Sequence, residues 1–422
     1  MKRNRISRRG FLARSTAAAA SLGTTALFAR RAQAANERLS IGVIGTGGRG
    51  THLMDQIMAL ASDQNVEITA VCDVWKPNAQ RAAEAVQKRF GREPRQFSRF
   101  GELLALDDVD AVVIATPDFA HTPILTAALE ANKDVYVEKP MAIDVADANR
   151  ALDLARARER VVQAGTQYRS HGGYIATAKV LASGRLGHVS RVTAEANFNH
   201  ARWDRGFSDC KEGDVDWKGY LLDLPDRPFD PKILRRWQLY RECTNGLAGL
   251  WMSHYADAVH LMTGAKYPRS AVAHGSIYVW KDGRQHSDTF HALLDYPEGF
   301  LFSWAMGLAN SAATRFAVYG TQGTLDVGTA HVTPDRLALS PDGGAEGSPV
   351  KVEKIAPDPP TTGDPIRAHM ANWLECIRSR KRPNADIQYG HQHAVATIMA
   401  AAALHTGQRH VYDPEKREVR PG

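Results

Sequence analysis

Cysteine is scarce in this sequence. The 422 residues include only four, Cys72, Cys210, Cys243 and Cys376, and no two of them form a CxxC pair. A structural zinc site needs closely spaced cysteine and histidine ligands, so no metal site is expected. We expect mostly buried free thiols, although the sequence leaves a Cys210–Cys243 disulfide open.

A net excess of positive charge is also missing from most of the chain. The first 34 residues contain eight lysines and arginines and no acidic residue, so they account for the net charge of +7. The remainder is nearly neutral, which gives a nucleic-acid partner no electrostatic support. Beyond the leader no run is apolar enough for a membrane-spanning helix, and there is no internal repeat. The composition is typical of a soluble globular protein with two domains.

Residues 1–34 have the pattern of an export signal. The run Ser7-Arg8-Arg9-Gly10-Phe11-Leu12 places paired arginines before Phe-Leu, as in twin-arginine signals. Residues 17–29 are weakly apolar and too short to span a bilayer easily. Ala32-Gln33-Ala34 resembles a cleavage site. We therefore expect a twin-arginine signal peptide and a periplasmic protein.

Apolar strands alternate with helices over residues 36–160. The predicted strands are 39–44, 66–71, 111–115 and 135–137, with helices at 51–60, 77–90 and 121–131. This alternation predicts an α/β Rossmann domain with a doubly wound parallel sheet. Over residues 161–365, longer strands joined by hairpin signals predict an α+β substrate-binding domain with an open, largely antiparallel sheet. Residues 366–422 are predicted to be a helical segment that packs back on the core.

A glycine-rich turn connects the first predicted strand to the first helix. Its sequence is Gly45-Thr46-Gly47-Gly48-Arg49-Gly50. Glycines allow the backbone to approach a pyrophosphate, which then meets the helix N-terminus. Asp73, at the end of the next strand, would accept ribose hydroxyls and repel a 2′-phosphate. We therefore expect NAD as the cofactor in preference to NADP.

Other strand ends point to the same edge of the sheet. Thr116 and Pro117 follow the strand at 111–115, with His121 just beyond, and Glu138-Lys139-Pro140 follows the strand at 135–137. We predict that Thr116, Pro117, His121, Glu138 and Lys139 contact the cofactor. A desolvated lysine can act as an acid or base.

These motifs together resemble the Gfo/Idh/MocA family of glucose–fructose oxidoreductases, inositol dehydrogenases and their relatives. The shared segments are the GxGxxG turn, residues 115–121 and 137–140, Gly165-Thr166-Gln167-Tyr168-Arg169, and residues 245–264 and 373–380. The resemblance spans about residues 38–415. It implies an NAD-dependent oxidoreductase acting on a CH–OH group of a sugar, polyol or glycoside. It also implies that Lys139 and His254 are catalytic.

The resemblance also implies substrate-binding residues. Gln167 and Arg169 would lie near the nicotinamide or the sugar, with Gln167 also contacting the cofactor. Asp257, three residues after His254 on one helix, would face the same side. Aromatic rings stack on sugars and arginines bind hydroxyls or anions, which adds Arg236, Trp251 and Tyr255. Weaker candidates of the same kinds are Trp203, Trp217, Arg235, Trp237 and Tyr240.

One position departs from the family pattern. Many dehydrogenases of the family carry an aspartate four residues before the histidine, where this chain has Leu250. Export also matters, because the periplasm is not expected to supply free NAD. Two readings follow: a tightly bound cofactor that shuttles hydride between two substrates, and an NAD-dependent, redox-neutral glycoside hydrolase resembling α-N-acetylgalactosaminidases. A noncatalytic sugar-binding protein is a third. An exposed sheet face would suit a homodimer or tetramer.

Overall fold

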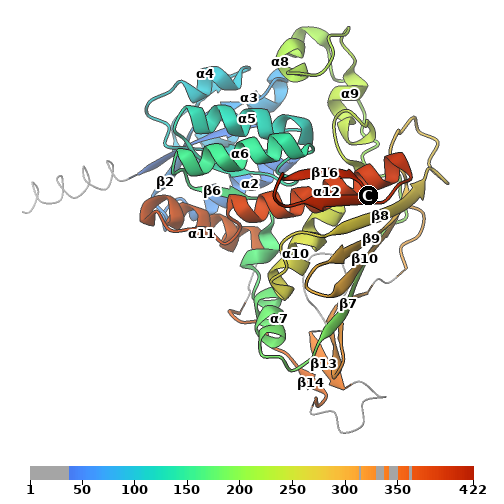
Figure 1. Cartoon of the computed structure of the whole chain (residues 1–422). Helices are drawn as coiled ribbons and strands as arrows, with labels where there is room; N and C mark the ends of the chain where they lie inside the picture. Colours follow the sequence, from blue (N-terminus) through green and yellow to red (C-terminus); the bar gives the residue numbers. More distant parts are fainter. Residues whose placement is uncertain (1–37, 313–314, 329–336, 342–349, 361–363) are drawn as a thin grey trace, which may run out of the picture.

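The computed structural model describes residues 38–312, 315–328, 337–341, 350–360 and 364–422. The predicted signal peptide at 1–34 lies outside the described residues. Figure 1 shows two sheets, a blue-to-green one surrounded by helices and a larger yellow-to-orange one, with the red helix α12 between them. The parallel and largely antiparallel sheets predicted from the sequence are confirmed.

The first sheet has six strands in the order β3-β2-β1-β4-β5-β6, and every neighbouring pair is parallel. The strands are β1 (Leu39–Ile44), β2 (Val66–Cys72), β3 (Arg95–Phe97), β4 (Ala111–Ile114), β5 (Asp134–Val137) and β6 (Val162–Ala164). The helices are α2 (Gly48–Leu60), α3 (Lys76–Phe90), α4 (Phe100–Leu104), α5 (Asp118–Glu130) and α6 (Val145–Ala157). This order reverses between β1 and β4, where open sheets of this kind bind ligands.

Local sequence features explain why these strands are buried and where these helices begin and end. All residues of β4 and β5 are buried, as expected of strands covered by helices on both faces. Asp144 caps α6 by accepting hydrogen bonds from Ala146 N and Asp147 N at 2.8 and 3.1 Å. Gly91 ends α3 in the left-handed conformation, with φ of +71°.

The second sheet has ten strands in the order β14-β13-β12-β11-β7-β10-β9-β8-β15-β16. Its neighbours are antiparallel except for the parallel pair β7 and β10. The strands are β7 (Val189–Asn197), β8 (Ser270–Ser276), β9 (Thr289–Tyr296), β10 (Phe300–Gly307), β11 (Phe316–Gly320), β12 (Gly323–Gly328), β13 (Ala338–Pro341), β14 (Glu353–Lys354), β15 (His410–Asp413) and β16 (Glu418–Pro421).

One face of this sheet is covered by helices, and the other carries exposed apolar side chains. The helices and turns of this half are η1 (Gln167–Ser170), α7 (Gly172–Ala182), η2 (Glu212–Asp214), α8 (Trp217–Leu221), α9 (Pro231–Arg235), η3 (Trp237–Leu239), the π-helical turn η4 (Ala248–Met252) and α10 (Ser253–Thr263). Val272 and Leu293 pair across β8 and β9 on the uncovered face, with Leu301 on β10. Alternation of buried and exposed residues along β9 and β10 is typical of such a half-covered sheet.

The C-terminal part of the chain returns to both halves. Helix α11 (Pro365–Ser379) packs Trp373 against Tyr136 of β5, with ring centroids 5.8 Å apart. Helix α12 (Ile387–Thr406) contributes Met399 to the core of the second sheet and Ile398 to that of the first. The prediction that residues 366–422 form a helical segment is wrong beyond Thr406. Gly407, with φ of +68°, ends α12, and β15 and β16 then extend the second sheet beside β8.

Two global features bear on the sequence predictions. Within the described ranges, no helix is both long and apolar enough to cross a membrane. All four cysteines are free and buried.

A buried ion pair joins the elements next to the domain boundary. Arg169 Nε of η1 lies 2.8 Å from Asp257 Oδ1 of α10, and both side chains are almost fully buried. The guanidinium also lies 3.7 Å from the ring centroid of Tyr389 on α12. Burial raises the pKa of Asp257, and Arg169 opposes this rise. Each charge therefore depends on the other.

We predict that Asp257→Asn lowers the free energy of unfolding by about 3–5 kcal/mol, because it leaves Arg169 buried without a countercharge. Urea denaturation followed by circular dichroism measures this loss. The matched control is Asp108→Asn, which breaks the exposed Arg95–Asp108 pair and should cost less than about 1 kcal/mol. Equal losses in the two variants would contradict the structural role of the buried pair.

Candidate active site

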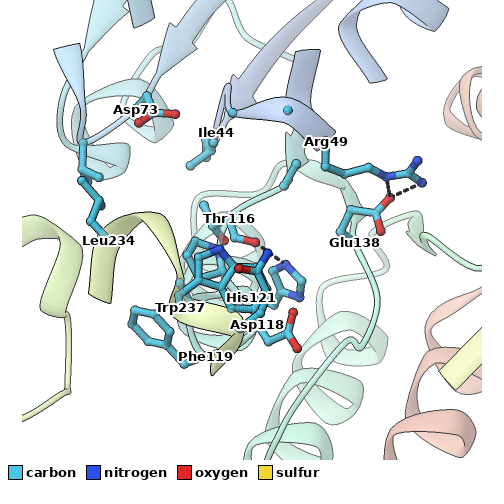
Figure 2. A pocket seen from close by; sticks show the side chains of 18 of the residues that line it. Ile44, Arg49, Asp73, Thr116, Asp118, Phe119, His121, Glu138, Leu234 and Trp237 are labelled. Atoms are coloured by element: carbon cyan, nitrogen blue, oxygen red, sulfur yellow. Dashed lines mark hydrogen bonds and ion pairs between the residues drawn. The ribbon is translucent and has the colours of Figure 1, made fainter. Parts of the chain in front are cut away.

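A pocket of about 690 Å³ opens at the carboxyl ends of the parallel strands and extends to the second half of the molecule. Its lining includes the glycine-rich turn, the ends of β2, β4 and β5, and the π-helical turn η4. Figure 2 shows Asp73 at one end, Arg49 and Glu138 at the other, and Thr116, Asp118 and His121 between them. The pocket thus lies at the reversal of strand order between β1 and β4.

The glycine-rich turn is tightly packed against β4. Gly45 has φ of +85°, and a Cβ there would lie 2.7 Å from the carbonyl of Ala115. A Cβ on Gly50 would lie 1.9 Å from Gly45 O. Gly47 caps α2 without any side-chain hydrogen bond, so the first backbone N–H groups of α2 lack a side-chain acceptor. This geometry fits a pyrophosphate at the helix N-terminus.

Asp73 is anchored by the turn that it faces. Its Oδ2 accepts hydrogen bonds from Thr46 N at 2.8 Å and Asn78 Nδ2 at 3.2 Å, and its Oδ1 accepts from Trp75 N at 2.9 Å. Burial raises the pKa of Asp73, while these hydrogen bonds lower it. The carboxylate still lines the pocket, where a ribose hydroxyl could reach it. Contact with the ribose stays a prediction.

An ion pair between Glu138 and Arg49 connects the end of β5 to the start of helix α2. Arg49 Nε and Nη2 lie 2.7 and 2.6 Å from Glu138 Oε1, as Figure 2 shows. A Cβ on Gly165 would lie 2.7 Å from the same oxygen. The pair therefore fixes the loop before Lys139 in place.

Lys139 and His254, the predicted catalytic residues, both line the pocket. Lys139 Nζ donates a hydrogen bond to the carbonyl of Leu250 at 2.6 Å. Burial lowers the pKa of Lys139, although the nearby carboxylates of Asp118 and Glu138 oppose this. Leu250, which occupies the position of the family's aspartate, therefore holds the lysine through its backbone.

His254 is neutral at neutral pH. Burial lowers its pKa well below the usual value, and the positive charges of Lys139 and Arg49 lower it further. Its Nδ1 is buried and has no hydrogen-bond partner among the described residues. Thr116 Oγ1 and Gln167 Oε1 are likewise buried without described partners. Because all three residues line the pocket, these atoms fit a ligand that supplies the missing hydrogen bonds.

Asp118 lies beside Lys139, and the sequence reading gave it no role. Thr244 Oγ1 donates a hydrogen bond to Asp118 Oδ2 at 2.7 Å. Burial raises the pKa of Asp118 to about 6, despite the opposing charges of His121 and Lys139. His121 lies between two carbonyls, 2.9 Å from Thr116 O and 2.8 Å from Pro140 O. It therefore joins the loops that follow β4 and β5.

Residues 198–244, here called the strap, leave β7 and cross to the Rossmann domain. Asp216 N donates to Val74 O at 2.8 Å, and Val215 pairs with Trp75 as an antiparallel bridge. Arg99 Nε lies 3.2 Å from Asp216 Oδ2. In Figure 1 the strap helices α8 and α9 stand beside the helices of the parallel sheet.

A second set of contacts holds the end of the strap. Phe119 N donates to Cys243 O at 3.1 Å, and the rings of Phe119 and Tyr220 meet edge to face at 5.6 Å. Leu234 and Trp237 of the strap line the pocket opposite the strand ends, as Figure 2 shows. The strap therefore covers the pocket from the side opposite the parallel sheet.

The pocket lining includes many of the predicted site residues but not all of them. Those that line it are Gly45, Gly47, Gly48, Arg49, Asp73, Thr116, Pro117, His121, Glu138, Lys139, Gln167, Trp251 and His254. Thr46 and Gly50 lie behind the turn, where Thr46 orients Asp73 and Gly50 permits close packing. The weaker candidates Trp203, Arg235 and Trp237 also line the pocket, whereas Trp217 and Tyr240 do not.

Four of the predicted substrate-binding residues do not line the pocket. Arg169 and Asp257 neutralise each other inside the core and do not line the pocket. Tyr255 is fully buried, 4.5 Å from the ring centroid of Trp304. Arg236 pairs with Asp204 at 2.7 Å and does not line the pocket. In each case a partner distant in sequence determined the direction of the side chain.

Several lining residues were not predicted. They are mainly strap residues and residues next to strand ends, namely Trp75, Arg81, Asp118, Phe119, Arg202, Arg205, Tyr220, Leu234 and Gln238. Asp118 carried a usable signal, because it lies within the segment 115–121 that resembles the family. The strap residues gave no local signal.

Comparison with known proteins follows the same division of the chain. Residues 39–166 match the family model described as oxidoreductase family, NAD-binding Rossmann fold. Residues 225–326 match that of the GFO/IDH/MocA C-terminal domain. The inositol 2-dehydrogenase of Salmonella typhimurium is 32% identical over 156 residues, which cover 36% of this chain and 44% of that protein.

Two further proteins are similar. A glycosyl hydrolase family 109 protein of Saccharopolyspora erythraea is 34% identical over 178 residues, covering 37% of this chain and 38% of that protein. These alignments thus span less than half of both curated relatives. The aldose-aldose oxidoreductase of Caulobacter crescentus, solved with glycerol, has the same fold, with a TM-score of 0.66 and 20% identity over 88% of this chain and 99% of that one. The chain belongs to the Gfo/Idh/MocA family of oxidoreductases, and its first domain is the family's NAD-binding Rossmann domain.

Proposed function

We propose that the protein is an exported oxidoreductase that removes hydride from a hydroxyl-bearing carbon of a sugar or polyol and retains its NAD. One observation carries this proposal. A single pocket contains both the glycine-rich turn with Asp73 and, at its other end, Lys139 beside His254. Similarity to an inositol 2-dehydrogenase and to the fold of an aldose-aldose oxidoreductase supports a sugar-type substrate.

We call the part of the pocket around Lys139 and His254 the substrate end. Its residues suit removal of a hydroxyl proton. Bound NAD would accept the hydride from the carbon. His254 is neutral, because burial and adjacent positive charge lower its pKa, and it can therefore accept the hydroxyl proton. Lys139, held by the Leu250 carbonyl, can donate a hydrogen bond to the same substrate oxygen as the carbonyl forms. Asp118 supplies a negative charge that favours the ammonium form of Lys139.

The strap and the leader together support retention of the cofactor. The strap contacts the Rossmann domain through two sets of backbone hydrogen bonds, at Val74 and Phe119, so opening it requires breaking both. The twin-arginine pattern at Arg8-Arg9 supports export of a folded, loaded protein. A retained cofactor must be reoxidised in place, so a second carbonyl substrate would complete the cycle.

A redox-neutral glycoside hydrolase is the second candidate. It is favoured by the 34% identity to a glycosyl hydrolase family 109 protein and by Leu250 at the family's aspartate position. In this cycle a hydroxyl is oxidised to a ketone and the glycosidic bond is lost by elimination. Water then adds and the ketone is reduced again. Aryl glycosides distinguish the candidates, because only this cycle releases the phenol without added cofactor.

We predict that protein purified without added nucleotide retains NAD(H) through gel filtration. Tyr220→Ala should increase cofactor loss, because it removes the ring that packs on Phe119 at the strap contact. Acid or heat extraction followed by chromatography measures the nucleotide per protein. Tyr278→Ala is the control, since this tyrosine is 58% exposed and does not line the pocket. Nucleotide-free wild-type protein would refute retention.

Lys139→Ala should reduce hydride transfer by about 10²–10⁴-fold, the usual contribution of a positioned acid or base. Single-turnover reduction of the bound nicotinamide by sugars, followed by its absorbance, measures this. Lys133→Ala is the control, because this lysine binds the carbonyls of Leu106 and Val109 away from the pocket. Near-normal turnover in Lys139→Ala, with circular dichroism unchanged, would remove Lys139 from the mechanism.

The rate should also depend on the ionisation of Asp118, whose pKa is about 6. Below that pH the carboxyl is neutral and the negative charge beside Lys139 is lost, so kcat/KM should fall as pH decreases through about 6. Asp118→Asn keeps an acceptor for Thr244 and should abolish this limb of the pH profile. Asp295→Asn, on the uncovered sheet, should leave it in place. Persistence of the limb in Asp118→Asn would assign it to another group.

A further inference from the structure

Arg202 of the strap lies at the substrate end of the pocket with its charge uncompensated. Its guanidinium carbon is 4.4 Å from the ring centroid of Phe198 and 4.8 Å from that of Trp251. Its Nε is buried, and no hydrogen bond or ion pair of this side chain is found among the described residues. By contrast, Arg49 of the same pocket is paired with Glu138. The aromatic rings thus hold Arg202 in place without satisfying its donors.

The position of Arg202 relative to the reacting groups follows from its neighbours. Trp251 comes directly after Leu250, whose carbonyl binds Lys139, and its ring lies 6.3 Å from that of His254. The positive charge of Arg202 is also among those that lower the pKa of Lys139. Arg202 is therefore close to the predicted catalytic pair.

The substrate end has more cationic donors than free carboxylates. Leu250 is apolar, and Glu138 is already paired with Arg49. Asp118 is bound by Thr244 and lies beside Lys139. Carboxylates accept hydrogen bonds from the hydroxyls of neutral sugars, and both carboxylates of this end already have a partner within the protein.

We propose that Arg202 binds an anionic group, a carboxylate or a phosphate, on the sugar substrate. A guanidinium presents a planar set of donors that matches either group with two parallel hydrogen bonds. Stacking between the rings of Phe198 and Trp251 already restricts the rotamers of Arg202, so binding of a ligand costs less side-chain entropy. The hydride chemistry of such a substrate rests on the proposed function, but its binding does not.

The test compares acidic sugars with their neutral counterparts. Tryptophan fluorescence of the cofactor-loaded protein is titrated with D-glucuronate, D-glucose 6-phosphate and D-glucose, and in parallel with D-galacturonate, D-galactose 6-phosphate and D-galactose. We expect at least one acidic member to bind about 10–100-fold more tightly than its neutral counterpart, the range for a charge-assisted hydrogen bond. The uronate and phosphate arms identify which anion is preferred.

Variants assign this preference to the arginine. Arg202→Gln should abolish the ratio of acidic to neutral affinity, and Arg202→Lys, which keeps the charge without the planar donors, should reduce it less. Arg191→Gln is the matched control, because Arg191 stacks on Tyr319 at 4.0 Å but is exposed and does not line the pocket. Thermal unfolding shows whether each variant is folded, and Arg202→Lys serves if Arg202→Gln is not.

Three outcomes would overturn the inference: equal affinities for acidic and neutral members, no saturable binding of any acid, or a ratio that survives in both Arg202 variants. Turnover is measured separately, by the absorbance of the bound nicotinamide. Arg202-dependent binding of acids without any reduction of the cofactor would leave this inference standing and refute the proposed function. If only neutral sugars reduce the cofactor, and acidic and neutral sugars bind equally well, the proposed function would stand and this inference would be refuted.

Discussion

The hydrogen bond from Lys139 Nζ to the carbonyl of Leu250 joins the two halves of the pocket. Lys139 follows strand β5 of the parallel sheet, whereas Leu250 lies in the π-helical turn that precedes helix α10. Such turns recur at functional sites, because they change the direction of a few backbone groups within a helix. A buried amine without this acceptor would bear the full cost of desolvation. The position of the second domain therefore determines whether Lys139, a residue of the first domain, has a hydrogen-bond acceptor.

The strap also depends on contacts between the two domains. Its contacts at Val74 and Phe119 are backbone hydrogen bonds, which are independent of side-chain type at the partner positions. Its side chains Leu234 and Trp237 supply the apolar wall. A cofactor lying between the parallel strand ends and this wall would be released only when the strap separates from both contacts. On the proposal that the cofactor is retained, its slow exchange would follow from chain connectivity, because residues 198–244 leave the second domain, contact the Rossmann domain and return.

Patterns that depend on neighbouring residues were readable from the sequence. The apolar runs of β1, β4 and β5, the glycine-rich turn and Asp73 belong to this class, since each requires only local geometry. Strands β3 and β6 were missed, because three residues are too few for a periodic signal. Asp257 was correctly placed on one helix with His254, but its buried ion pair with Arg169 holds both side chains in the core. The positions of Arg202 and the strap depend on contacts between distant segments, which no local pattern encodes.

A retained cofactor imposes opposite requirements on the two ends of one pocket. Both half-reactions of a hydride shuttle would use Lys139 and His254, so the first product must leave before the second carbonyl compound enters. The cofactor end must stay closed throughout, and Leu234, Trp237 and Tyr220 provide apolar contacts there that gain nothing from hydration. The substrate end must exchange its occupant, and the guanidinium-bearing side chain of Arg202 makes the pocket lining there charged. A redox-neutral hydrolase would need the same asymmetry. With a retained cofactor, apolar closure at one end of the pocket and polar access at the other would therefore be required by either of the two proposed reactions.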